Sequence, residues 1–316
     1  MEIVKGWFKP NPQALRSLLE KKKQSSTSCS FVQLLNKEDI ELAQEEITNG
    51  KFCFYGSLLL SLCLGSHLPS LYEPLFSYSL LYVLIDSFLD KPKLTENKKD
   101  TLCHLYALLE GEAPPPGNAF LSLVNKHYTR LLEYKPAIRG DLLKIFLVEL
   151  ESVSFQSSPQ HTEEEFMHMC RKKGALSLQA LFTLNGKQGE AVSRLGDTAS
   201  PSLDTRSEQG NIASDEEIGF CIQLLDDLYD VFLDKEENIH TIATHHLAQH
   251  GNCDRLYMFT LERIESLPSR FILLQTTMMA FAVCLAHNVP CLSSSLKGQI
   301  EPFFFLPPGV QLSSLL

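Results

Sequence analysis

Apolar residues recur with helical spacing along most of this chain, and alternating β-branched runs are nearly absent. Two capping-box signatures, Thr162 with Glu165 and Ser214 with Glu217, mark helix starts. We therefore expect an all-α protein in which residues 1–316 form a single helical domain. Besides an acidic helix after Ser214, the pattern predicts helices over about 11–23, 31–49, 52–64, 70–89, 95–111, 117–133, 136–153, 163–184, 239–250, 253–266 and 267–288.

One segment, 185–213, breaks this pattern. It is long, polar and rich in Gly and Ser. A connection of that length without apolar positions is uncommon inside a domain, and it is either functional or disordered. We expect a flexible loop between the two capped helices.

Composition and charge restrict the class of protein. The 44% hydrophobic and 21% charged residues are ordinary for a soluble globular protein. A net charge of −10 without a basic stripe argues against a nucleic-acid partner. Nine dispersed cysteines without a CxxC pair, and a start without an apolar leader, predict a reduced, cytoplasmic protein.

The strongly apolar stretch 56–85 is interrupted at Gly65, His67, Pro69 and Glu73. We therefore expect a buried helix pair there and no transmembrane span. Peripheral membrane contact and a homodimer remain open.

Four aspartates stand on an otherwise apolar helix in CIQLLDDLYDVFLDKEEN (221–238). Asp226, Asp230 and Asp234 recur every four residues and form one stripe, with Asp227 beside it. Like charges at this spacing repel, and partial burial raises the cost of each charge. The stretch therefore calls for a bound cation.

A second acidic pair, Asp86 and Asp90, lies upstream near the end of another apolar helix. Carboxylates on two helices can face each other across a bundle cavity, and all-oxygen sites suit Mg²⁺ or Mn²⁺. Because Mg²⁺ usually takes few carboxylates and fills its other positions with water and phosphate, the two sets predict a phosphorylated ligand. The alternative is that both sets are solvated helix faces; it suits the isolated pair better than the leucine-embedded stripe.

These residues carry a resemblance to a known family. GFCIQLLDDLYD (219–230) is similar to the second Asp-rich motif of prenyl diphosphate synthases, DSFLD (86–90) stands where the first motif is expected, and CRKKGALSLQALF (170–182) resembles the lysine-bearing helix between them. Over about residues 50–290 the chain thus resembles the class I isoprenoid synthase superfamily, which includes trans-prenyl diphosphate synthases and class I terpene synthases. The resemblance implies a helical bundle around a central apolar cavity, in which Mg²⁺ binds a prenyl diphosphate.

The resemblance also implies a role for each motif residue. The carboxylates would hold up to three Mg²⁺ ions, with Mn²⁺ as the alternative metal. The cationic residues and a glutamine would contact the diphosphate, and two rings would stabilise a carbocation. The residues are Asp86, Asp90, Asp226, Asp227, Asp230 and Asp234 for metal; Arg171, Lys172, Lys173 and Gln223 for the diphosphate; and Tyr82 and Phe220 for the carbocation. The loop 185–213 would close over the site.

The chain departs from the family pattern in ways that bear on which subfamily, and which reaction, it resembles. The first motif lacks an adjacent Asp pair, no Arg pair follows Asp90, and no GGKR-like segment is present. Because those groups normally bind a second, homoallylic diphosphate, we favour a terpene-synthase-like reaction on one substrate. Chain elongation is the alternative, although the second motif is not the Asn/Ser/Glu triad of typical microbial cyclases either. A non-catalytic partner subunit with the same fold is a third interpretation, against which the intact DDLYD argues.

One further pair has metal-ligand spacing. His246 and His250 are four residues apart, but no HExxH motif is present and the sequence shows no evident third ligand. Solvated or packed histidines are the favoured interpretation of this pair.

Overall fold

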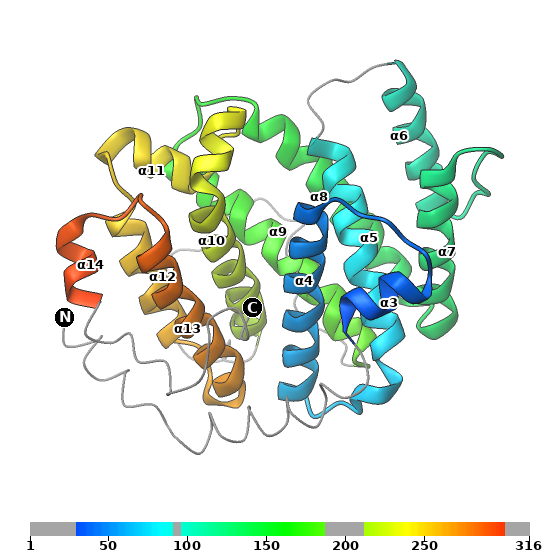
Figure 1. The fold of residues 1–316 in the computed structure, drawn as a ribbon, viewed down its shortest axis with the longest axis horizontal. Coiled ribbons are helices and arrows are strands. Elements are labelled where there is room, and N and C mark those ends of the chain that lie inside the picture. The colour runs from blue at the N-terminus through cyan, green and yellow to red at the C-terminus, as the bar shows by residue number, and fades with distance from the viewer. Residues whose placement is uncertain (1–29, 91–95, 187–211, 301–316) are drawn as a thin grey trace. The chain divides into compact units, whose positions relative to one another are not determined.

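Helices form in most of the places where the apolar spacing predicts them. This computed structural model describes residues 30–90, 96–186 and 212–300. Those ranges contain twelve α-helices and no strand, which confirms the all-α prediction (Figure 1). The predicted helix 11–23 and most of the predicted loop 185–213 lie outside the described residues.

The chain divides into two compact units. Unit 2 comprises residues 26–153 and 179–188, and unit 1 the remainder. The helices of unit 2 are α3 (Phe31–Lys37), α4 (Gln44–Cys63), α5 (Tyr72–Asp90), α6 (Glu96–Leu109), α7 (Ala119–Tyr134) and most of α8 (Ile138–Gln156). Unit 1 contains most of α9 (Glu163–Leu184), with α10 (Ile212–Glu237), α11 (Ile242–His250), α12 (Asp254–Glu265), α13 (Ile272–Asn288) and α14 (Ser294–Ile300). The single-domain prediction stays a prediction.

In unit 2, the ring of Phe31 packs α3 against α4 and α5. Phe31 packs against Phe54 and Phe76, with ring centroids 5.9 and 5.4 Å away. Its ring also lies against Gly50, where a Cβ atom would collide with it. Gly50 lies inside α4, so the predicted break between 49 and 52 was wrong.

The actual break lies between α3 and α4. Asp39 has a positive φ of 55°, which ends helical geometry. Next to it, the carboxylate of Glu38 accepts hydrogen bonds from Lys126 and Arg130 of α7. Burial alone would raise the pKa of Glu38, but these two cations outweigh it and hold the pKa below its usual range. Contacts with a distant helix thus set this boundary.

A buried serine–histidine–glutamate chain lies beside Glu38. Ser77 Oγ is 3.0 Å from Nδ1 of His127, and Nε2 of His127 is 3.6 Å from the Glu38 carboxylate. The order of groups is that of a hydrolase triad, yet Ser77 is 1% and His127 0% exposed. Burial lowers the pKa of His127 to about 4. Because no substrate reaches a serine buried in this way, the network serves to join α3, α5 and α7.

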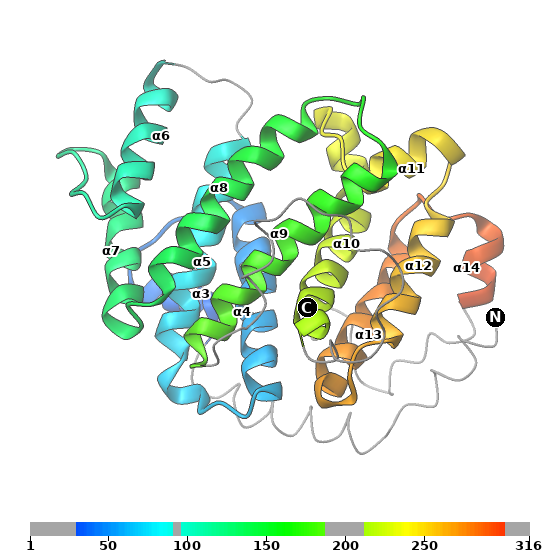
Figure 2. The same ribbon diagram turned by 180° about the vertical axis from the view of Figure 1, so that it is seen from behind.

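In unit 1, α10 packs against α11, α12 and α13. The helix α9 crosses α10 where Gly174 meets Gly219 (Figure 2). A Cβ atom on either glycine would fall inside the backbone of the other helix, at its carbonyl group. Only glycine at both positions permits this close approach.

Two helices of unit 1, α9 and α11, begin directly after a capping threonine. Thr162 and Glu165 form the predicted capping box, with N···O distances of 2.7 and 3.2 Å. The second predicted box was wrong, because α10 begins at Ile212 and places Ser214 inside the helix. Thr241 caps α11 by accepting from the Thr244 N–H, so this helix begins three residues later than predicted.

Among the described helices, one stretch, Ser269–Ala286, is long and apolar enough to cross a membrane by length and composition alone. Half of this window is buried inside the structure, and a single helix of this kind is weak evidence for a membrane span. No clear transmembrane span is therefore indicated.

Candidate functional site

The acidic stripe of α10 runs from the surface into the interior of unit 1. Asp226 is exposed, Asp230 and Asp234 are half-buried, and Asp227 is only 8% exposed. Helical spacing brings the four carboxylates to neighbouring positions, while Leu224, Leu225, Leu228 and Val231 fill the core on the other side. The stripe is therefore not a solvated helix face throughout.

Gln223 joins two carboxylates of the stripe. Its Nε2 donates to Asp227 Oδ1 at 3.0 Å and to Asp226 Oδ2 at 3.2 Å. Burial raises the pKa of Asp227 to about 6, against the opposing effects of the Gln223 amide, the Lys173 charge and the Ile242 backbone N–H. Gln223 thus holds the two side chains in a fixed relation, and its predicted contact with the diphosphate stays a prediction.

Asp234 is the last of the four aspartates along α10. It accepts a hydrogen bond from Thr241 Oγ1 at 3.1 Å. Burial, together with the charges of Asp227 and Asp230, raises the pKa of Asp234 to about 8 in spite of that bond. The neighbouring carboxylates thus make the surroundings of Asp234 negative, which is the electrostatic setting in which a divalent cation binds.

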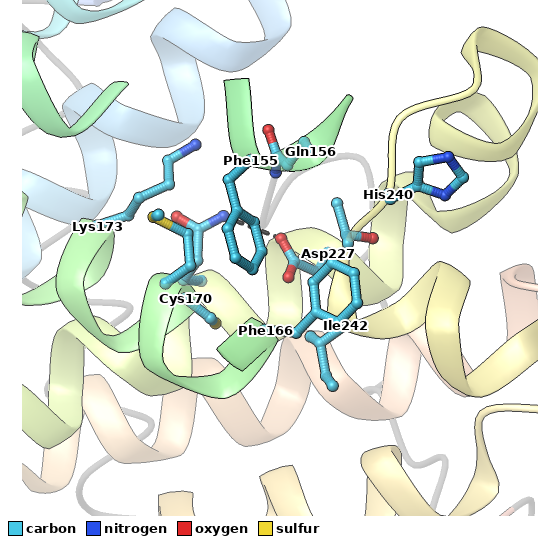
Figure 3. A pocket seen from close by; sticks show the side chains of 11 residues that line it. Phe155, Gln156, Phe166, Cys170, Lys173, Asp227, His240 and Ile242 are labelled. Atoms are coloured by element: carbon cyan, nitrogen blue, oxygen red, sulfur yellow. Dashed lines mark hydrogen bonds between the residues drawn. The ribbon is translucent and has the colours of Figure 1, made fainter. Parts of the chain in front are cut away.

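A small pocket in unit 1 is lined by Asp227, the most buried carboxylate of the stripe. Figure 3 shows Phe155, Phe166 and Ile242 gathered around Asp227, with Lys173 at one side. The pocket is lined by Phe155, Gln156, Phe166, Met169, Cys170, Lys173, Gln223, Asp227, His240, Thr241 and Ile242. It combines one carboxylate and one cation with aromatic and aliphatic walls.

The three cationic candidates on α9 have different surroundings in the structure. Lys173 lines the pocket near Asp227, whereas Arg171 donates to Glu217 of α10 at 2.8 Å. The Arg171 guanidinium also lies 4.0 Å from the centroid of the Phe220 ring. Lys172 is half-buried and does not line the pocket. Lys173 is thus the best placed of the three for an anionic ligand beside the stripe.

Phe220, predicted to face a carbocation, is 1% exposed. Its ring packs under Arg171 and meets Phe259 edge to face at 6.3 Å. Glu217 accepts from Arg171 and lies 3.5 Å from Arg263. In this structure Phe220 therefore belongs to an ion-pair and cation–π cluster that joins α9, α10 and α12.

The remaining candidates belong to unit 2. Asp86 on α5 is half-buried, and Asp90 is the last residue of that helix. Tyr82, one turn before Asp86, donates from its hydroxyl to the buried carboxylate of Glu149 at 3.4 Å. The predicted participation of these residues in the same site as the α10 stripe stays a prediction.

Sequence reasoning missed the part of the pocket that follows α10. His240 and Thr241 lie in the turn to α11, and the His240 N–H donates to the Gln156 carbonyl at 2.9 Å, which fixes this turn against the end of α8. The T-x-x-T spacing of Thr241 and Thr244 was the available signal, since it marks a helix N-cap. Phe155 and Phe166 carry no local signal beyond being apolar.

Within residues 30–90, 96–186 and 212–300, no three His, Cys, Asp or Glu side chains already have their donor atoms gathered for one ion. The donor set of the stripe is nevertheless carboxylate oxygen, which fits Mg²⁺ or Mn²⁺ better than Zn²⁺. Asp226 and Asp230 would supply accessible oxygens, and ligand oxygens would have to complete the coordination. No family model and no curated protein matches this chain.

The raised pKa of Asp234 predicts a stability effect. The folded chain keeps a proton on Asp234 that the unfolded chain loses near pH 4. The free energy of unfolding is therefore not reduced by Asp234 below about pH 4, and it falls as pH rises from there to about 8. Asp234→Asn removes the titration. We expect the melting temperature of the variant, relative to the unchanged chain, to increase from pH 5 to about pH 8 and then level off. Glu237→Gln, on the exposed end of the same helix, is the control; a parallel profile for both variants would contradict the shift.

Proposed function

We propose that this protein is a Mg²⁺-dependent class I isoprenoid synthase that ionises an allylic prenyl diphosphate and releases diphosphate. The observation that carries the proposal is the acidic stripe of α10, whose clustered carboxylates run into an apolar interior and have raised pKa values at Asp227 and Asp234. A helix that only packs has no use for such a set, because each buried carboxylate opposes folding near neutral pH.

Under this proposal, the residues of the site in unit 1 have different roles. Asp226, Asp227 and Asp230 would hold Mg²⁺, which supplies Lewis-acid stabilisation of the departing diphosphate. Gln223 orients Asp226 and Asp227 through its amide. Lys173 supplies a positive charge next to Asp227 for the phosphate oxygens. That Asp86 and Asp90 bind the same ions rests on the resemblance and not on geometry.

A reaction on a single prenyl diphosphate, as in terpene synthases, is favoured over chain elongation. The basis is the sequence: the groups that normally bind a homoallylic diphosphate are missing around Asp90 and before it. On the same proposal the protein acts in the cytoplasm, and its substrate is a prenyl diphosphate of unspecified chain length.

The decisive experiment measures diphosphate release from C10, C15 and C20 prenyl diphosphates by the purified chain with Mg²⁺, with and without isopentenyl diphosphate. We expect release without isopentenyl diphosphate, and hydrocarbon or alcohol products. Release only in its presence, with longer prenyl diphosphates as products, would favour chain elongation. No release from any of the three substrates, with Mg²⁺ or Mn²⁺, would favour the non-catalytic interpretation.

A further inference from the structure

A second cluster of ligating side chains lies in unit 1, away from the acidic stripe. It consists of His246 and His250 on α11 and Glu163 at the first position of α9. Glu163 Oε1 lies 3.4 Å from Nε2 of His246, and the two histidine rings have centroids 5.4 Å apart. Glu163 is the third group that the sequence did not reveal beside the histidine pair.

His246 is the unusual member of this cluster. Its side chain is 1% exposed, and neither ring nitrogen has a hydrogen-bond partner in the part of the chain that the structure describes. Unpaired buried polar atoms are rare, because each costs free energy on folding. Burial also lowers the pKa of His246, which favours the neutral imidazole that binds metals.

The separations match those of ligands on one tetrahedral ion. Ligand atoms bound to Zn²⁺ at about 2.0–2.1 Å stand roughly 3.3 Å apart, and two imidazoles on the same ion have centroids roughly 5 Å apart. The Glu163–His246 contact and the spacing of the two rings agree with both values. The donor atoms of the three side chains are not gathered around one point in the described residues, so the ring of His250, which is exposed, has to turn to complete the set.

We propose that Glu163, His246 and His250 form a binding site for a divalent transition-metal ion, with Zn²⁺ as the fitting ion and water in the fourth position. Two imidazoles and one carboxylate are a common zinc donor set, whereas Mg²⁺ prefers oxygen ligands alone. The ion would fasten the start of α9 to the end of α11. Phe166 and Ile242 of these two helices line the pocket at Asp227, so the ion would also stabilise the wall of that pocket.

One neighbouring cation competes for Glu163. Arg255 of α12 approaches its Oε1 with a nitrogen at 3.9 Å, but the arginine side chain is 73% exposed. Such an exposed contact contributes little energy, and the long side chain can turn away into solvent. Arg255 therefore does not close the site to a metal ion.

The test measures Zn²⁺ binding by calorimetry and the visible d–d bands of Co²⁺ on the chelator-treated full chain. We expect one ion per chain, four-coordinate Co²⁺ bands, and a higher melting temperature with Zn²⁺ but not with Mg²⁺. His250→Ala and Glu163→Gln should each weaken binding by more than about 100-fold, since the loss of an outer-shell partner alone costs 10–100-fold.

Two controls make the result specific. His168→Ala removes an exposed histidine of α9, and Asp227→Asn changes the acidic stripe; neither should alter Zn²⁺ binding. Because His250 is exposed, its variant is expected to fold even if His246→Ala does not. Absence of binding, unchanged affinity in His250→Ala, or an equal loss in His168→Ala would each overturn the proposal.

Discussion

Asp227→Asn is expected to lower diphosphate release by more than about 100-fold and to leave helical content unchanged. The substitution keeps the size of the side chain and removes one negative charge at the buried end of the stripe. If Asp227 is a metal ligand, the loss should exceed the 10–100-fold that changes around a ligand cause. The measurement is steady-state diphosphate release over a range of Mg²⁺ concentrations, where the variant should require more Mg²⁺ for half-maximal rate.

Stability gives this variant a second readout. Because burial raises the pKa of Asp227 to about 6, removing the carboxylate should raise the melting temperature at pH 8 without Mg²⁺. A lower rate together with a higher melting temperature separates a role in the reaction from damage to the fold.

Glu237→Gln is the matched control, since Glu237 is exposed at the end of the same helix. Asp86→Asn tests the carboxylate of unit 2 in the same assay. A rate within a few-fold of the unchanged chain in Asp227→Asn would remove Asp227 from the metal site. The same outcome in Asp86→Asn alone would confine the site to the stripe of α10.

Gly219→Ala and Gly174→Ala are expected to destabilise unit 1 by about 3 kcal/mol or more, at or above the upper end of the usual range for overpacking. At each position the added Cβ atom meets the backbone of the opposite helix, so no flexible side chain can move aside. The two helices must separate or rotate instead. The measurement is the free energy of unfolding from urea titration of each variant.

Gly56→Ala provides the control for the glycine variants. Gly56 lies in the middle of α4, and an added Cβ atom meets no other atom within 4 Å. Alanine should stabilise a helix at such a position by up to about 1 kcal/mol. Equal effects of the three substitutions would contradict the close crossing at Gly174 and Gly219.

The crossing also links the fold to the candidate site. Gly174 directly follows Lys173, and Gly219 lies one turn before Gln223. A displacement of α9 from α10 would therefore move the cation away from the carboxylate in the pocket. Diphosphate release should fall in both glycine variants even at temperatures where they remain folded.

The sequence alone determined the all-α class, most of the helices and the stripe of aspartates. These follow from local physics: apolar spacing sets which face is buried, and a four-residue repeat aligns side chains on one face. The capping box at Thr162 and Glu165 was equally readable, because its hydrogen bonds join residues three positions apart. The place of Gln223 one turn before Asp227 followed from the same spacing.

Only the tertiary structure decided which of these side chains have partners. Arg171, Lys172 and Lys173 are neighbours in the sequence, yet Arg171 pairs with Glu217, 46 residues away, while Lys173 lines the pocket. Gly50 lies inside α4, where only the tertiary structure places the ring of Phe31 against it, and Glu163 joined the histidine pair only through the packing of α9 near α11. Such contacts join residues distant in the chain, and no local pattern encodes them. Helical spacing fixes which face a side chain occupies, but the neighbouring helix determines its environment there, and hence its charge and chemistry.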